Sequence, residues 1–133
     1  MTEGGVGPRM VPAGTVSRRV AVTMAWTASV LAATGAAPDP RYPLDGGDLL
    51  PELRGTRPPR PRTLHWRHRR LDVPAIQEAM LEGRLEYLAR DERELLLDLA
   101  RDEGEQADLA RVRPADVARM GARRGEWFAE IAQ

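Results

Sequence analysis

Residues 85–99, with the sequence LEYLARDERELLLDL, decide the fold of this protein. On both sides of a charged tetrapeptide, apolar side chains recur at every second position: Leu85, Tyr87 and Ala89, and then from Leu95 onward. A period of two is typical of β-strands, and the tetrapeptide at 90–93 has the polarity of a tight turn. The stretch therefore predicts an antiparallel hairpin with one apolar face, although the local propensity of its leucines favours a helix.

The segments around this hairpin predict one more strand and two helices. Residues 63–68 (TLHWRH) alternate in the manner of a strand, whereas 74–82 (PAIQEAMLE) predict a short helix with Pro74 in its first turn. Residues 114–131 predict an amphipathic helix. Its apolar face consists of Val117, Met120, Trp127, Phe128 and Ile131, with Arg124 inside the stripe.

The first half of the chain is rich in proline and glycine and predicts mostly loops. Residues 20–34 (VAVTMAWTASVLAAT) predict a helix that ends at Gly35 and, being apolar nearly all round, is buried on several sides. Residues 48–53 predict a short helical turn capped by Asp48. The expected fold class is α+β: one apolar helix, then a small antiparallel sheet covered by a C-terminal amphipathic helix.

Residues 17–37 also allow a second interpretation. A basic start at Ser17-Arg18-Arg19, an apolar middle and small residues at the end are similar to an export signal. A membrane span is not expected, because the run is short and diluted with Thr and Ser. Localisation therefore stays open, with the cytoplasm slightly favoured over export.

Composition excludes several kinds of chemistry. The 133 residues include 20 basic and 20 acidic side chains, and this net charge of zero argues against nucleic acid as a partner. Cysteine is absent, which excludes disulfides, thiolate nucleophiles and cysteine metal sites. Every basic residue is arginine, so lysine Schiff-base chemistry is excluded as well.

No familiar catalytic motif is present. The two serines, Ser17 and Ser29, lie outside any G-x-S-x-G turn, and no glycine-rich phosphate loop occurs. His65 and His68 are three residues apart, so on a strand they face opposite sides and would not jointly hold a metal. The acid pairs at 91–92 and 102–103 lie in charged regions and are expected to be solvated.

Seven phrases, in order, carry a resemblance to a known family. They are EGGV at 3–6, VPAGTVS at 11–17, VAVTMAWTA at 20–28, the segment 31–40, LDGGDLLP at 44–51, RTLHWRH at 62–68, and LLLDL at 95–99 with the acids that follow it. This series resembles the C-terminal third of sulfatases, the formylglycine-dependent sulfuric ester hydrolases of the alkaline-phosphatase-like superfamily. The resemblance implies that 1–62 is the end of the main sulfatase domain and 63–133 a C-terminal subdomain.

The sequence also departs from the family. Residues 83–87 read GRLEY where the family has G-D-W-K-L/Y, Glu103 replaces a proline, and Ala25 replaces a helix acid. The family's nucleophile is a formylglycine made within C/S-x-P-x-R, and that motif is absent here. The calcium ligands of the family precede the region that resembles this chain. Calcium and formylglycine therefore cannot be placed on this chain, and no catalytic or metal-binding residue is predicted.

The resemblance implies a C-terminal fragment or truncated homologue of a sulfatase that is inactive alone and acts on sulfate esters only within an intact enzyme. Its expected partner is a sulfatase catalytic region supplied in trans. Side chains suited to contact an anionic substrate are His65, Arg67 and His68. Two alternatives remain: a small exported binding protein whose signal is 17–37, and an interaction module that acts on another subunit.

Overall fold

The computed structural model describes residues 11, 13–14, 16–17, 19–69 and 76–131. The chain divides into two compact units, Met1–Arg60 and Pro61–Gln133. Each unit has its own elements, and each is described separately below. The EGGV phrase at 3–6 lies outside the described residues.

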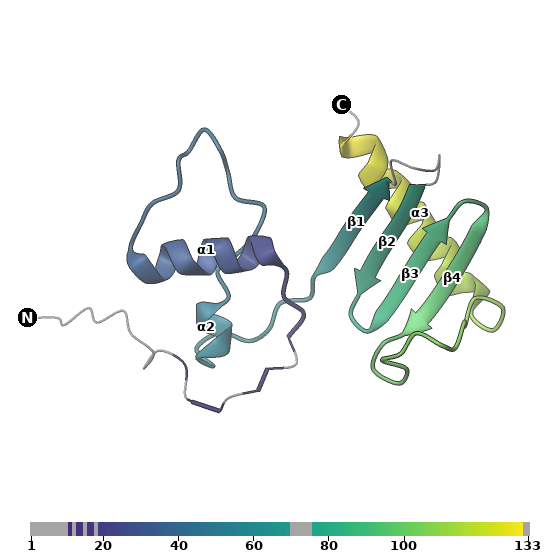
Figure 1. Ribbon diagram of the computed structural model, residues 1–133, viewed down its shortest axis with the longest axis horizontal. Coiled ribbons are helices and arrows are strands. Elements are labelled where there is room, and N and C mark those ends of the chain that lie inside the picture. The colour runs from purple at the N-terminus through teal and green to yellow at the C-terminus, as the bar shows by residue number, and fades with distance from the viewer. Residues whose placement is uncertain (1–10, 12, 15, 18, 70–75, 132–133) are drawn as a thin grey trace, which may run out of the picture. The chain divides into compact units, whose positions relative to one another are not determined.

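The first unit contains two helices, α1 (Thr23–Thr34) and α2 (Leu50–Leu53) (Figure 1). Helix α1 ends as predicted at Gly35, which adopts a left-handed φ of 71°. The amide N–H groups of Gly35 and Ala36 donate to carbonyl groups of the last turn. Asp48, the predicted cap of the second helix, lies one residue before the observed cap position, which Leu49 occupies. Its carboxylate still accepts a 2.8 Å hydrogen bond from the Leu50 amide.

Helix α1 buries its small side chains and exposes its large ones. Ala25, Ala28 and Ser29 are buried, whereas Trp26 and Val30 are more than half exposed. The expectation of burial on several sides was therefore wrong for this chain, since its described residues cover only one side of the helix. Small side chains let a neighbouring backbone come close, and the segment at 46–49 uses this space.

The second unit is a four-stranded antiparallel sheet in the order β1-β2-β3-β4 (Figure 1). Its strands are β1 (Thr63–Arg69), β2 (Ile76–Glu82), β3 (Leu85–Arg90) and β4 (Arg93–Asp98). The hairpin of β3 and β4 and the strand at 63–68 confirm the predictions. The helix predicted at 74–82 was wrong: residues 76–82 form β2, paired along its length with β1 and β3, and 74–75 lie outside the described residues. Pairing on both edges outweighs the local helical preference of this segment.

Helix α3 (Pro114–Ile131) covers one face of the sheet, as predicted, and crosses behind the strands in Figure 1. Met120 of the helix is fully buried against a row of side chains that contains Met80, Tyr87 and Leu96. This register corrects one detail of the hairpin. Tyr87 pairs with Leu96, so Leu96 faces α3, whereas Leu95 and Leu97 lie on the face away from the helix. Both faces of β4 therefore carry apolar side chains.

Within the part of the chain that the structure describes, no helix is both long enough and apolar enough to cross a membrane.

Candidate functional site

The three predicted contact residues lie on two different faces of the sheet. His65 and Arg67 point toward α3, whereas His68 lies on the face opposite the helix. On the helix side, the His65 ring stacks on Trp127 with centroids 4.7 Å apart. The guanidinium of Arg67 lies 4.8 Å from the centre of the Phe128 ring. The three residues therefore cannot act as one cluster on one ligand.

Arginines on the helix side are engaged with carboxylates of the sheet. Glu78 forms ion pairs with Arg124 at 3.0 Å and with Arg67 at 3.7 Å. Glu82 contacts both Arg119 and Arg123 of α3, and these contacts, led by the hydrogen bond from Arg119, hold the pKa of Glu82 below its usual value. This set of pairs attaches α3 to the sheet and leaves its arginines little freedom to bind an outside anion.

The packing around His65 favours its neutral form. Burial lowers the pKa of His65, and the nearby Arg123 charge lowers it further. Its Nδ1 atom is buried and has no hydrogen-bond partner among the described residues. A neutral ring stacked on Trp127 is a packing element of the helix–sheet contact.

Tyr87 lies beneath the same helix. Its hydroxyl donates to Glu94, and burial is the main reason why the pKa of Tyr87 rises to about 12. The Arg124 guanidinium lies 5.9 Å from the ring centre. Tyr87 therefore stays protonated and serves as a fixed hydrogen-bond donor in the core.

The opposite face of the sheet holds an open hollow of about 280 Å³. His68 contributes to its lining, together with Trp66 and Arg90. Trp66 is 41% exposed. Sequence reasoning missed Arg90 and Gln77 here, because the segment containing Gln77 was interpreted as helix. The alternation contained a signal, since Trp66 and His68 of β1 and Leu88 and Arg90 of β3 are each two residues apart. Ala79 and Gln77 of β2 pair with both sets and place all of them on one face.

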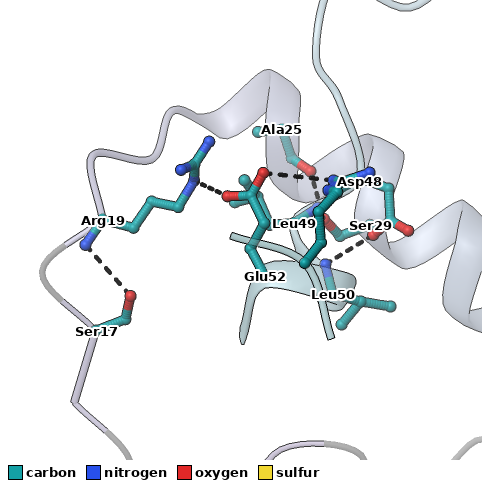
Figure 2. A network of polar contacts seen from close by, with 9 residues as sticks. Ser17, Arg19, Ala25, Ser29, Asp48, Leu49, Leu50 and Glu52 are labelled. Carbon is teal, nitrogen blue, oxygen red and sulfur yellow. Dashed lines mark hydrogen bonds and ion pairs between the residues drawn. The ribbon is translucent and has the colours of Figure 1, made fainter. Parts of the chain in front are cut away.

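The first unit contains a network of polar contacts (Figure 2). The Glu52 carboxylate is 3% exposed and forms ion pairs with Arg19 and, at 3.4 Å, with Arg57. Ser29 donates to the Ala25 carbonyl at 2.7 Å and accepts from the Leu49 amide at 2.8 Å. These contacts tie the segments on both sides of α1 to one another, so the network is structural.

Residues suited to a metal centre are not gathered anywhere in the described part of the chain. No three His, Asp or Glu side chains there are close enough together to hold an ion. Glu78 and Glu82, which face α3, are paired with arginines instead. With no C/S-x-P-x-R motif in the sequence, these residues do not fit a calcium–formylglycine centre.

Comparison with known proteins defines the class of fold. A putative sulfatase from Bacteroides thetaiotaomicron matches with a TM-score of 0.61 and 21% sequence identity, over 77% of this chain and 23% of the sulfatase. A 2-O GAG sulfatase matches with a TM-score of 0.60, the same identity and the same coverage. No family model and no curated protein matches the sequence.

The chain therefore has an α+β fold that is similar to part of these two sulfatase structures. It spans about a quarter of the length of the sulfatase structures that it matches. The resemblance seen in the sequence is thus confirmed at the level of the fold.

Proposed function

We propose that this chain corresponds to the C-terminal part of a sulfatase and supports a catalytic region that supplies the nucleophile and the metal ligands. The observation that carries the proposal is the match of 77% of this chain to only 23% of two sulfatase structures. In this proposal residues 1–62 complete the main domain, and 63–133 form the subdomain beside it. By itself the chain does not hydrolyse sulfate esters.

The chemistry of the residues supports an auxiliary role. Sulfate-ester hydrolysis needs an activated nucleophile and stabilisation of anionic charge in the transition state. The sequence has no formylglycine motif, and Arg119 and Arg124 of α3 form ion pairs with sheet carboxylates. The chain instead contributes a sheet with a helix packed on it, which suits a supporting structural role.

The contacts of α1 favour this proposal over a role as an exported binding protein. Ser29 bonds to the Leu49 amide, and Arg19 forms an ion pair with the buried Glu52. These contacts are characteristic of an integral element, because a cleavable signal would not need bonds to residues beyond its own cleavage site.

The test is complementation of a sulfatase catalytic region that lacks its own C-terminal portion. The purified chain alone should release no phenol from phenyl sulfate, and the mixture or co-expressed pair should recover turnover. Met120→Asp, which places a charge in the fully buried core, should abolish recovery, whereas Val112→Asp at a position 73% exposed should not. Turnover by the pure chain, or equal recovery with both variants, would contradict the proposal.

A further inference from the structure

The sheet face opposite α3 carries two adjacent rows of side chains with different chemistry. One row crosses all four strands as Trp66, Ala79, Leu88 and Leu95. All four residues line the hollow of about 280 Å³. With Trp66 41% exposed beside three aliphatic side chains, this row gives the hollow an apolar wall.

The next row is cationic and contains no acid. It consists of His68, Gln77, Arg90 and Arg93, again one residue from each strand. Arg90 and Arg93 are directly opposite one another at the hairpin turn, and like charges so placed repel. Neither makes an ion pair within the part of the chain that the structure describes.

Most acidic side chains of the strands lie on the sheet face toward α3 and not on the opposite face. Four strand carboxylates, those of Glu78, Glu82, Glu94 and Asp98, lie on the face toward α3. The one strand carboxylate on the opposite face is Glu86, which lies two rows from the cationic row, or about 13 Å along the strands. On the helix side Arg67 forms an ion pair with Glu78, whereas on the opposite face neither Arg90 nor Arg93 has an acidic partner among the described residues.

We infer that this hollow binds a small ligand in which an oxyanion is attached to a flat ring. The ring lies on Trp66 and the apolar row, and the oxyanion lies beside Arg90 and His68 of the lining, with Arg93 opposite Arg90 at the edge of the hollow. An anion there relieves the repulsion between the two arginines and accepts their charge-assisted hydrogen bonds. The inference rests on the sheet alone and holds whether or not the chain supports a catalytic region.

The test is a titration of the ¹⁵N-labelled chain with phenyl sulfate, followed by NMR. The Trp66 indole N–H and the Arg90 side-chain N–H signals should shift and saturate, and the Trp26 indole of the first unit provides an internal control. Phenol has the ring without the oxyanion, and inorganic sulfate has the oxyanion without the ring. Both should bind more weakly than phenyl sulfate. Glucose 6-sulfate replaces the flat aromatic ring by a puckered sugar and should also bind more weakly than phenyl sulfate, and tighter binding of glucose 6-sulfate would contradict a site for a flat ring.

Variants distinguish binding at this site from nonspecific binding of anions to exposed arginines. Arg90→Gln should weaken phenyl sulfate binding about tenfold, as expected for the loss of one charge-assisted hydrogen bond. The matched control is Arg111→Gln, at an exposed arginine outside the sheet, which should leave binding unchanged. Arg93→Gln provides a second variant if Arg90→Gln disturbs the hairpin. Equal weakening by the control, equal binding of phenol, or equal shifts at Trp26 would overturn the inference.

Discussion

At the scale of the residue, Gly46 occupies a position that admits no side chain. A Cβ atom placed there would lie 2.1 Å from the Met24 carbonyl oxygen and 2.5 Å from the Ala25 amide nitrogen. Both contacts are with backbone of α1, which cannot rotate away. Its neighbour Gly47 has nothing within 4 Å of the same added atom.

We therefore expect Gly46→Ala to lower the free energy of unfolding of the first unit by about 3 kcal/mol, the cost of forced overpacking. Gly47→Ala is the matched control and should change it by less than about 1 kcal/mol. The measurement is denaturant unfolding followed by NMR at the indole N–H signal of Trp26 in α1. Similar midpoints for the two variants would mean that the segment 46–49 does not pack on α1 as described.

A second prediction at this scale concerns the pH dependence contributed by His65. Its pKa is lowered in the folded state from an ordinary value of 6.5, chiefly by burial. The unfolded chain therefore binds a proton at a higher pH than the folded chain does. Stability from this group is fully present above pH 6.5 and is lost as the pH falls through 6.5 toward the folded pKa.

His65→Gln should flatten the stability profile between pH 7 and pH 5, because glutamine does not titrate. Thermal unfolding of wild type and variant across this range measures the effect. His68→Gln, at an exposed position of the same strand, is the control. Parallel profiles for wild type and His65→Gln would show that His65 is as free to protonate in the fold as in the unfolded chain.

At the scale of the element, α3 is held to the sheet by apolar packing and, to a smaller extent, by ion pairs. Met120 is fully buried, whereas the pairs of Glu82 with Arg119 and Arg123 lie near the surface. Surface ion pairs contribute about 0.2–1 kcal/mol each, and a buried methionine truncated to alanine costs about 2–5 kcal/mol. Burial therefore outweighs charge in docking α3.

We expect Met120→Ala to destabilise the second unit several times more than Glu82→Gln does. The folded pKa of Glu82 is depressed, so its contribution is present above its ordinary pKa of 4.5 and is lost as the pH falls below that value. The difference between wild type and Glu82→Gln should accordingly vanish in strong acid. Urea unfolding at neutral and acidic pH measures both effects, and a Glu82→Gln effect as large as that of Met120→Ala would be inconsistent with this account.

The elements also show how far the sequence could be interpreted. The hairpin at 85–99 and the helix at 114–131 follow from period and turn signals and were confirmed. The strand β2 was missed, because PAIQEAMLE has local helical propensity and acquires strand geometry only between β1 and β3. In the candidate site, His68 was identified from its charge, whereas Arg90 and Gln77 could be joined to it only once β2 was recognised as a strand.

At the scale of the whole molecule, the first unit exposes a helix that is apolar on nearly every side. Trp26, Val30 and Met24 of α1 are 51%, 58% and 46% exposed. Exposed apolar surface of this kind favours association with another protein surface. In the proposed function, the remainder of a sulfatase covers that surface.

The isolated chain should therefore self-associate at raised concentration, and Trp26→Ser with Val30→Ser should reduce this association. Light scattering across a concentration series measures it. Exposed Val112, at 73%, lies in the second unit, and Val112→Ser is the matched control. A monodisperse wild-type chain at high concentration would contradict the prediction.

The sequence by itself determined the order and type of most elements, the end of α1 at Gly35, and the kinds of chemistry that the chain lacks. These features depend on residue identity and on periods of two or nearly four residues, both of which are local. Only the tertiary structure decided that residues 76–82 form a strand, that His65 stacks on Trp127 while His68 lines the hollow, and that Arg90 and Arg93 are paired in a row without an acid. The physical reason is that register and burial arise from contacts between segments distant in the chain, and these contacts outweigh local preference wherever the two disagree.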